Sequence, residues 1–314
     1  MTFKIDTPQS TRQSVYKHMG DKTDDFLSQV DRRLEKYIEK WQLSELTFMP
    51  TNTVNLLFSC KSGLYGSCVL KMCIPGAEVS TEINCLRFYD ETSYCKLWDY
   101  DLTDDILLLE RVTPGDQMRA VKDYRERARF LGMALEDLHI PYSGVEQCQY
   151  PTYLLWMEKI YCELTDVGGL EDVLSYLDKA KEVYGELKQR YPKTYLLHGD
   201  LHQENMLLNS KGNYTIIDPK GVIDIPVMET ARFLMNEVFV RRDEREIREM
   251  ATIISEIIDV SVEDILSAMF IDAALGQSWC MSEHYATKDA FEEAKRSALE
   301  ICKFVYGLLE KNGM

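Results

Sequence analysis

One short segment limits the folds open to this chain more than any other feature. It reads HGDLHQEN over residues 198–205 and is followed by IDPKG over residues 217–221. Two short strand-like stretches, joined by a polar turn, separate the two runs. If these stretches pair antiparallel, the chain returns to its starting point, and Asn205 and Asp218 lie close together in space. The fold must therefore contain a loop and hairpin that gather Asp200, Asn205 and Asp218.

The residue types in this loop indicate phosphoryl transfer. The spacing H-x-D-L-x-x-x-N is that of a kinase catalytic loop. Such chemistry needs a carboxylate that orients the attacking hydroxyl and accepts its proton, and oxygen ligands for the magnesium that neutralises the phosphates. Asp200 is the candidate catalytic base, and Asn205 and Asp218 are the candidate metal ligands. A lone aspartate in a loop is usually a turn or capping residue, but the three together favour function.

The histidines of the loop have an alternative interpretation. His198 and His202 stand four residues apart, a spacing that could bind zinc on a helix. Gly199 disfavours a helix and no glutamate follows His198 directly, so zinc binding is not favoured. We instead expect His198 to brace the loop through hydrogen bonds, and Lys220 to support the same loop.

The first part of the chain is expected to supply a lysine for the phosphates. Lys71 ends the run VLK much as the lysine of a kinase V-A-I-K element does. Its ammonium group needs a carboxylate partner, and a predicted helix that follows carries Glu78 and Glu82. Glu82 is favoured, because Glu78 falls at the start of the helix, where a carboxylate merely complements the dipole. The alternative for Lys71 is a solvated strand end.

The nucleotide must be covered without a glycine-rich loop, since no G-x-G-x-x-G occurs in the first hairpin. Asn52 and its neighbours could turn toward the phosphates, although a local Asx turn explains Asn52 equally well. The run Ile106–Arg111 would connect the two parts of the chain. Backbone groups of Glu110 and Val112 there could bind an adenine edge.

Periodicity and breakers predict an α+β fold in two domains. We expect an N-lobe over residues 1–112 and a C-lobe over residues 113–314, with the pattern changing near Pro114-Gly115. The N-lobe elements are a helix over 24–41, strands over 53–60, 67–73, 95–100 and 106–112, and a helix over 79–89. The C-lobe is predicted to be helical, with short strands only at 195–197, 206–208 and 214–217.

Charge and composition restrict the partners. Lys and Arg number 36 against 52 Asp and Glu, so the net charge of −16 repels nucleic acid and anionic lipid and suits a cationic small molecule. The first ten residues lack a secretory pattern and no apolar stretch approaches membrane-spanning length, so we expect a cytoplasmic protein without membrane contact. The nine cysteines, an odd number without a CxxC pair, are expected to be reduced thiols.

Several of these motifs together resemble a known family. HGDLHQEN, IDPKG, VLK, E-x-x-x-L-R from Glu82 to Arg87, and LLLERVTPG are similar to segments of the aminoglycoside phosphotransferase family, over roughly residues 45–310. IDPKG in particular resembles the streptomycin 6-kinase and hydroxyurea phosphotransferase branch. The resemblance implies a two-lobed protein-kinase-like fold, with an antiparallel sheet and a helix in the N-lobe and a larger, mainly helical C-lobe.

The same resemblance implies ATP, magnesium and a hydroxyl acceptor. It would make Asp200 the base, Asn205 and Asp218 the metal ligands, and Lys71 with Glu82 the phosphate-positioning ion pair. One departure stands beside the site. The branch usually continues with G-V-I-G-D-P-x-x-E, whereas this chain reads GVIDIPVME over 221–229, so Asp-Ile replaces Gly-Asp.

Acceptor selectivity is expected in the helical lobe. Trp279 and Glu283 resemble the tryptophan and acidic residue that end an alanine-rich helix of the branch, and they could face the substrate. A core tryptophan and a solvated glutamate are the ordinary alternative.

These observations together predict an ATP- and magnesium-dependent O-phosphotransferase that acts on a small, cationic, hydroxylated molecule such as streptomycin. Two other functions stay open. One is a nucleotide-binding regulator without catalysis, which the altered segment at Asp224-Ile225 would suit. The other is a metabolic kinase for a sugar, a choline-like amine or an amino alcohol. The sequence leaves the acceptor, the choice of ATP or GTP, the number of metal ions and the oligomeric state open.

Overall fold

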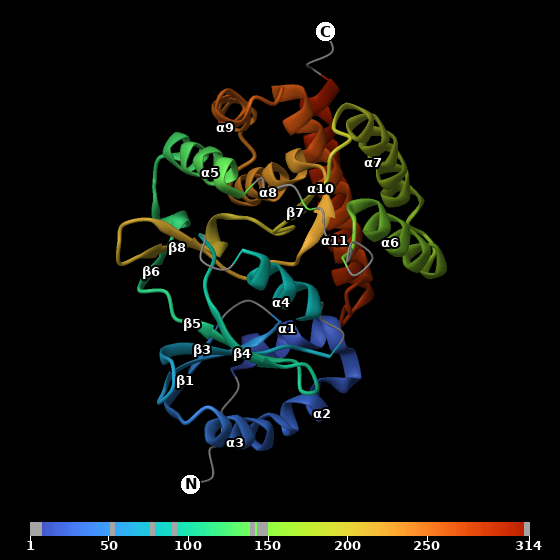
Figure 1. The fold of residues 1–314 in the computed structure, drawn as a ribbon. Helices are drawn as coiled ribbons and strands as arrows, with labels where there is room; N and C mark the ends of the chain where they lie inside the picture. Colours follow the sequence, from blue (N-terminus) through green and yellow to red (C-terminus); the bar gives the residue numbers. More distant parts are fainter. Residues whose placement is uncertain are drawn as a thin grey trace. The chain divides into compact units, whose positions relative to one another are not determined.

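The computed structural model describes residues 8–50, 54–75, 79–89, 93–138, 142 and 150–310. The chain divides into two compact units (Figure 1). Unit 1 comprises Met1–Gly115 together with Glu283–Tyr285, and unit 2 comprises Asp116–Ser282 together with Ala286–Met314. A three-residue segment from the C-terminal part of the chain thus belongs to unit 1, which the sequence did not indicate.

Unit 1 is built on a five-stranded antiparallel sheet in the order β1-β2-β3-β5-β4. The strands are β1 Leu43–Met49, β2 Leu56–Ser62, β3 Gly66–Met72, β4 Leu97–Asp101 and β5 Ile106–Glu110. Helix α4, Val79–Phe88, follows β3 and agrees with the expected helix over 79–89. Strand β1 was not predicted. Its register shifts between Ser44 and Thr47, and Glu45 has a positive φ of 54°, so the strand lacks regular alternation.

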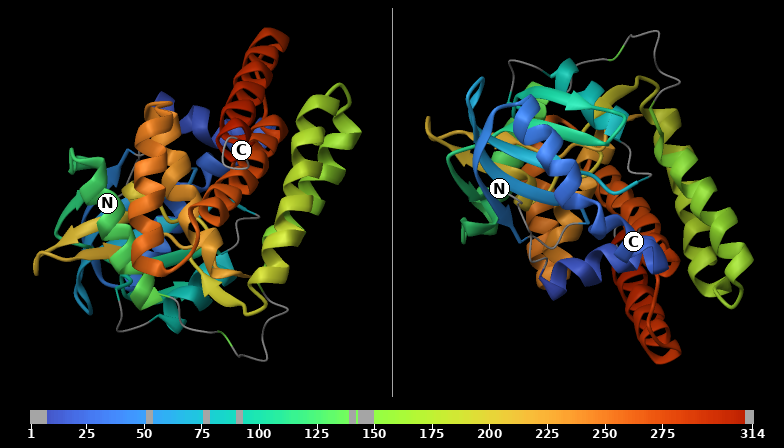
Figure 2. Two further views of the ribbon diagram at one scale, coloured as in Figure 1. Left: turned by 90° about the horizontal axis from the view of Figure 1, so that it is seen from above. Right: turned by 90° about the horizontal axis from the view of Figure 1, so that it is seen from below.

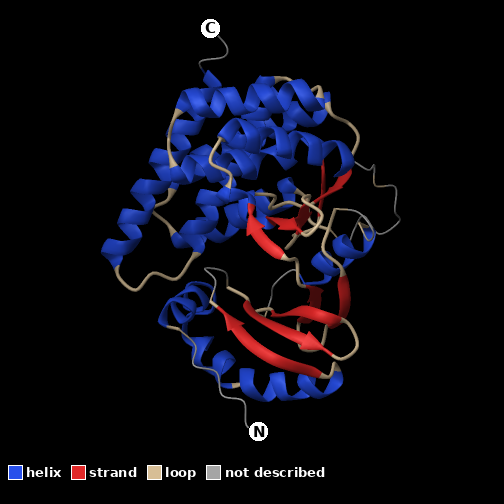
Figure 3. Cartoon of the chain, turned by 90° about the vertical axis from the view of Figure 1, so that its left-hand side faces the viewer, coloured by secondary structure: helices blue, strands red, loops and turns tan. Residues whose placement is uncertain are grey.

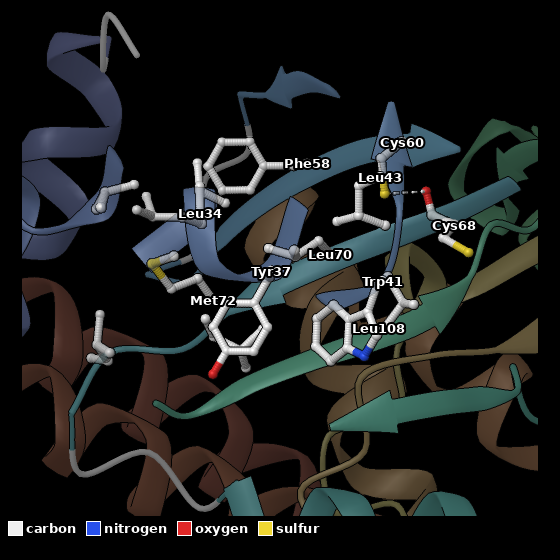
Figure 4. Packing of buried hydrophobic residues seen from close by; sticks show 14 of the residues in the cluster. Leu34, Tyr37, Trp41, Leu43, Phe58, Cys60, Cys68, Leu70, Met72 and Leu108 are labelled. Atoms are coloured by element: carbon white, nitrogen blue, oxygen red, sulfur yellow. Dashed lines mark hydrogen bonds between the residues drawn. The ribbon is translucent and has the colours of Figure 1, made fainter. Parts of the chain in front are cut away.

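The N-terminal helices of unit 1 cover one face of this sheet. They are α1 Gln9–Met19, α2 Thr23–Ser28 and α3 Val30–Lys40, so the single helix expected over 24–41 is interrupted at Gln29. Residues Leu34, Tyr37 and Trp41 pack with Phe58 and Leu70 of the strands in the core of the unit (Figure 4). Helix α1 was not predicted, because its polar sequence buries only Thr11 and Val15.

Unit 2 is mainly helical (Figures 2 and 3). Its helices are α5 Tyr124–Leu138, α6 Tyr153–Val167, α7 Glu171–Arg190, α8 Ala231–Val240, α9 Glu244–Ile258, α10 Val262–Ser282 and α11 Lys288–Glu310. Helix α10 packs against α6, α7, α8, α9 and α11, which explains why it is apolar on nearly all sides. None of the described helices is long and apolar enough to cross a membrane.

Two small sheets of unit 2 frame the predicted loop and hairpin. Strand β7, Tyr195–Leu197, pairs antiparallel with β10, Val222–Asp224. Strands β8, Met206–Asn209, and β9, Tyr214–Ile216, form the expected hairpin, which β6, Pro114–Gln117, extends. The expectation of only three strands in this half was therefore wrong. Strand β10 lies in the GVID run, and all three of its residues are buried.

Candidate active site

The backbone of the catalytic loop is fixed by one buried carboxylate. Glu229 accepts hydrogen bonds from the backbone N–H of His198 at 2.6 Å and of Gly199 at 3.1 Å. Gly199 has a φ of 77°, and a Cβ there would lie 2.5 Å from a methyl group of Val222, so only glycine fits between the loop and β10. Burial raises the pKa of Glu229 to about 7, although the two N–H groups act in the opposite direction.

His198 is fully buried and ties the loop to the end of the hairpin. Its Nδ1 accepts the N–H of Asp200 at 3.1 Å, and its Nε2 lies 2.8 Å from the carbonyl oxygen of Ile217. These partners require a neutral ring that is protonated on Nε2. Burial agrees with this state, since it lowers the pKa of His198 to about 4. The backbone N–H of Lys220 donates to the His198 carbonyl oxygen at 2.8 Å, while the Lys220 side chain is exposed.

The hairpin brings Asn205 and Asp218 to the same end of their strands. Met206 pairs with Ile216, and the N–H of Ile217 donates to the carbonyl oxygen of Asn205 at 3.0 Å. The side-chain amide of Asn205 donates to the Asp200 carbonyl oxygen at 3.0 Å, so the same residue also fixes the loop. Asp218 adopts a positive φ of 60°, a conformation that aspartate and asparagine tolerate.

The donor chemistry of this pair fits a magnesium ion. In the described part of the chain, no hydrogen bond occupies Oδ1 of Asn205, and Asp218 adds a carboxylate. Magnesium prefers such hard oxygen ligands and is usually bound by one or two carboxylates together with substrate phosphates and water. No cluster of three His, Cys, Asp or Glu side chains suited to a metal occurs among the described residues.

Lys71 and Glu82 form a buried ion pair in unit 1. The Nζ atom of Lys71, on β3, lies 2.8 and 2.7 Å from the two carboxylate oxygens of Glu82, on α4. Only 5% of the lysine side chain and 7% of the glutamate side chain are exposed. The alternative of a solvated lysine at a strand end is therefore wrong. A buried lysine fixed by a carboxylate is the arrangement expected of a group that positions phosphates.

The other residues of unit 1 that were predicted to bind the nucleotide are Asn52, Glu110 and Val112. Asn52, like Glu78, lies outside the described residues. Glu110 ends β5 and donates its N–H to the carbonyl oxygen of Lys96 at 2.8 Å, so this donor is already used. Val112 follows the strand and is half-buried. Adenine recognition by Glu110 and Val112 stays a prediction.

The two predicted acceptor residues fall in different units. Trp279, on α10 of unit 2, is half-buried and packs edge-on against Trp156 with ring centroids 5.3 Å apart. Glu283 belongs to unit 1, where its carboxylate lies 3.2 Å from Nζ of Lys17. Neither contact involves the catalytic loop, and the role of both residues in acceptor binding stays a prediction.

Two charged residues beside Asp200 escaped the sequence analysis. Arg232 of α8 places Nε 3.3 Å from Oδ1 of Asp200 and Nη2 3.2 Å from Oδ1 of Asp272, on α10. Asp272 is the single charged residue in the buried run Ile265–Leu275. A lone carboxylate in an apolar helix was the available signal, because such a charge is seldom buried without a partner.

A second polar network anchors the loop between Asp200 and Asn205. Arg119 donates to Glu204 at 2.8 Å, to Gln203 at 2.9 Å and to Glu237, on α8, at 2.9 Å. Burial alone would raise the pKa of Glu204, but hydrogen bonds from His202 and Arg119 lower it to about 2. His202 thus contributes to this network through the Glu204 carboxylate, 3.1 Å from its Nδ1.

The departure from the family pattern at Asp224-Ile225 has a structural explanation. The Asp224 carboxylate is fully buried and accepts the hydroxyl of Tyr184 at 2.9 Å and the N–H of Tyr153 at 2.8 Å. Lys188 lies 3.5 Å away as a counter-charge. The Asp224 side chain therefore joins β10 to α6 and α7, while the carboxylate that accepts the N–H groups of His198 and Gly199 is that of Glu229.

The opposite pKa shifts of His198 and Glu229 predict opposite effects of pH on stability. The pKa of His198 falls from 6.5 to about 4, so its contribution to stability is lost as pH falls through this range. The pKa of Glu229 rises from 4.5 to about 7, so this group stabilises the fold as pH falls. Between pH 6.5 and 5, each effect amounts to about 2 kcal/mol, and the two nearly cancel.

Single substitutions should therefore reveal the pH dependence that each group gives to the free energy of unfolding. On lowering the pH from 6.5 to 5, His198→Gln should gain about 2 kcal/mol in free energy of unfolding relative to the wild type, and Glu229→Gln should lose about as much. Urea unfolding at the two pH values measures both differences. Parallel pH profiles for the three proteins would contradict the assignment of these two groups as the titrating pair.

Comparisons with known proteins identify a family model and related proteins that are similar to this chain. Residues 40–283 match the family model described as aminoglycoside/hydroxyurea antibiotic resistance kinase. The streptomycin 6-kinase of Streptomyces griseus is 21% identical over 226 residues, which are 71% of this chain and 72% of that protein. The hydroxyurea phosphotransferase of Kitasatospora aureofaciens is 23% identical over 238 residues, or 74% and 68% of the two chains.

A solved structure agrees in fold. The amicoumacin kinase hAmiN, in complex with AMP-PNP, Ca²⁺ and Ami, superposes with a TM-score of 0.64 at 12% identity, and the match covers 88% of this chain and 96% of that one. The antiparallel sheet of unit 1 and the helical unit 2 are thus the two parts of a kinase-like fold, as predicted.

Proposed function

This chain belongs to the aminoglycoside/hydroxyurea antibiotic resistance kinase family and is a small-molecule kinase, and on that premise we propose that it is an ATP- and magnesium-dependent O-phosphotransferase. The acceptor is a hydroxyl of a small cationic molecule such as streptomycin. The single observation that carries this proposal is the geometry of the loop and hairpin, in which hydrogen bonds and strand pairing hold Asp200, Asn205 and the residue before Asp218 together.

Each group has a distinct task in the proposed reaction. Asp200 orients the acceptor hydroxyl and accepts its proton, while the acceptor oxygen bonds to the γ-phosphorus and the bond from that phosphorus to the bridging oxygen breaks, which releases ADP. Asn205 and Asp218 hold the divalent ion, which when bound neutralises phosphate charge. Lys71, fixed by Glu82, binds the phosphates of the nucleotide.

Two features support a cationic acceptor. The net charge of the chain is −16, which favours the approach of cations and disfavours anionic acceptors. Asp200 is a partly exposed carboxylate in unit 2, with 24% of its side chain accessible. The streptomycin 6-kinase relative makes streptomycin the first acceptor to test.

A regulator without catalysis is less well supported than an enzyme. The regulator was considered because the Asp224-Ile225 segment departs from the family pattern. The Asp224 carboxylate, however, accepts hydrogen bonds from the Tyr184 hydroxyl and the N–H of Tyr153, whereas the loop N–H groups bond to Glu229. The alteration leaves the backbone bonds at His198 and Gly199 in place. The altered segment therefore gives no support to a loss of catalysis.

Direct detection of the product tests the proposal. We expect the protein with ATP and MgCl₂ to add one phosphoryl group to streptomycin, as read by mass spectrometry, and to lose this activity when EDTA is present. Hydroxyurea, choline and ethanolamine serve as parallel acceptors. Transfer to choline or ethanolamine and none to streptomycin would replace streptomycin by another cationic acceptor, whereas transfer to uncharged hydroxyurea alone would contradict a cationic acceptor. Nucleotide binding, measured by thermal shift, without transfer or hydrolysis would contradict the enzyme and support the regulator.

A further inference from the structure

Arg232 connects a carboxylate in the core of unit 2 to the proposed catalytic base. Its guanidinium group lies 3.3 Å from Oδ1 of Asp200 through Nε and 3.2 Å from Oδ1 of Asp272 through Nη2. The Asp272 side chain is only 1% exposed, whereas the Asp200 side chain is 24% exposed. One cation thus bridges a fully buried anion and a partly exposed one.

The buried carboxylate is not explained by the packing of α10. Its neighbours along the helix, Met269, Phe270, Ile271 and Ala273, are all apolar and buried, so Asp272 is a charge within an otherwise apolar segment. Burial raises the pKa of Asp272, and the guanidinium of Arg232 acts against this rise. A buried ion pair seldom stabilises a fold more than well-packed apolar side chains do. The pair therefore calls for a reason beyond stability.

The hydrogen bonding of the pair is incomplete. Within the described ranges, Nε of Arg232 and Oδ2 of Asp272 are both buried and have no hydrogen-bond partner. The Nε–H group is the part of the guanidinium nearest to Asp200, at ion-pair distance but without hydrogen-bond alignment. Catalytic hydrogen bonds are often poorly aligned before substrate binds and tighten in the complex. Arg232 thus keeps one donor available for the Asp200 carboxylate.

Gly276 of helix α10 lies beside this guanidinium. Gly276 stands one turn after Asp272, and a Cβ placed on it would lie 3.6 Å from both Nη1 and Nη2 of Arg232. A carboxylate and a glycine four residues apart lie on the same face of a helix. The face of α10 toward Arg232 therefore supplies the counter-charge, and Gly276 on the same face lies next to the guanidinium.

We propose that Arg232 is a positioning residue for the phosphoryl transfer: it holds Oδ1 of Asp200 so that Oδ2 meets the acceptor hydroxyl, and Asp272 holds Arg232. This inference rests on the proposed function, in which Asp200 is the base. Arg232 exchanges no proton and touches no reacting atom. It restricts rotation of the Asp200 carboxylate, whose backbone is already fixed by His198 and Asn205.

A double substitution separates this role from simple charge neutralisation. Arg232→Met alone would leave Asp272 as an unpaired buried charge, which by itself destabilises the fold. Arg232→Met combined with Asp272→Leu removes both charges and fills the site with apolar side chains of similar size. If Arg232 only neutralises Asp272, this double variant should be fully active.

We expect the double variant to melt close to the wild type and to show a kcat reduced roughly 10- to 100-fold, with an unchanged KM for ATP. Arg232→Lys should fold and show an intermediate kcat, because a single ammonium group cannot contact both carboxylates as a planar guanidinium does. Arg241→Met, at an exposed arginine of unit 2, is the control for loss of one positive charge.

A wild-type kcat in the double variant would overturn the positioning role, and so would a wild-type kcat in Arg232→Lys if the double variant did not fold. Failure of the proposed acceptor is recognised separately. If the wild type hydrolyses ATP without modifying streptomycin, the acceptor is wrong and the same variants are compared by their hydrolysis rates. If the wild type does neither, both the proposed function and the role of Arg232 are overturned.

Discussion

Asp200→Ala is expected to lower kcat by roughly 10²–10⁴-fold, because the acceptor hydroxyl loses the carboxylate that orients it and accepts its proton. The variant should fold normally. The hydrogen bonds of Asp200 run through its backbone, whose N–H donates to His198 and whose carbonyl oxygen accepts from Asn205. Arg232, the ion-pair partner of its carboxylate, remains paired with Asp272 in the variant. The KM for ATP should change little, since the nucleotide is assigned to other residues. Initial rates with streptomycin at saturating ATP measure the effect.

Asp166→Ala is the matched control for this substitution, since Asp166 is an exposed aspartate on α6. It should retain wild-type kcat. Turnover of Asp200→Ala within a few-fold of this control would remove Asp200 from the proposed mechanism.

Asp218→Asn is expected to abolish most activity at ordinary magnesium concentrations while the fold is kept. The backbone at Asp218 has a φ of 60°, which asparagine adopts as readily as aspartate, so the substitution changes the charge without straining the chain. A neutral amide binds a hard divalent cation far less well than a carboxylate does. The rate of phosphorylation should therefore require much more magnesium or never recover.

Titration of the rate against magnesium for both proteins provides the measurement. If Asp218 serves only to cap the turn before Lys220, asparagine replaces it with little loss, and the two curves overlap. Overlapping curves would thus remove Asp218 from the metal site. The thermal unfolding of both proteins without magnesium verifies that the fold is unchanged.

The parts of the site that could be predicted are those that local sequence determines. Asn205 and Asp218 lie together because a short hairpin joins them, and hairpin pairing depends on residues close in the chain. The ion pair of Lys71 and Glu82 could be predicted for a similar reason, since a strand and the helix that follows it position the two residues. In both cases the spacing of the motif along the chain predicts which residues lie close together.

The parts that escaped prediction depend on packing between distant elements. Arg232 and Asp272 meet only because α8 lies against α10, and nothing in the spacing of the two residues records that contact. Glu229 was noticed only as the end of a family pattern, whereas its two hydrogen bonds to the loop backbone depend on the turn after β10. Strand β1 was missed because its irregular register removes the alternation by which strands are recognised.

Because the segment Glu283–Tyr285 belongs to unit 1, the two units cannot be separated by cutting the chain at one point. His284 donates its N–H to the carbonyl oxygen of Lys17 at 2.9 Å and packs near Tyr16, so α1 is completed by residues encoded far downstream. A fragment that ends at Gly115 would lack these partners, and a fragment that begins at Asp116 would carry them without α1. Exchange of unit 1 between related kinases would therefore require a compatible segment at 283–285, which makes this kinase less modular than its two compact units suggest.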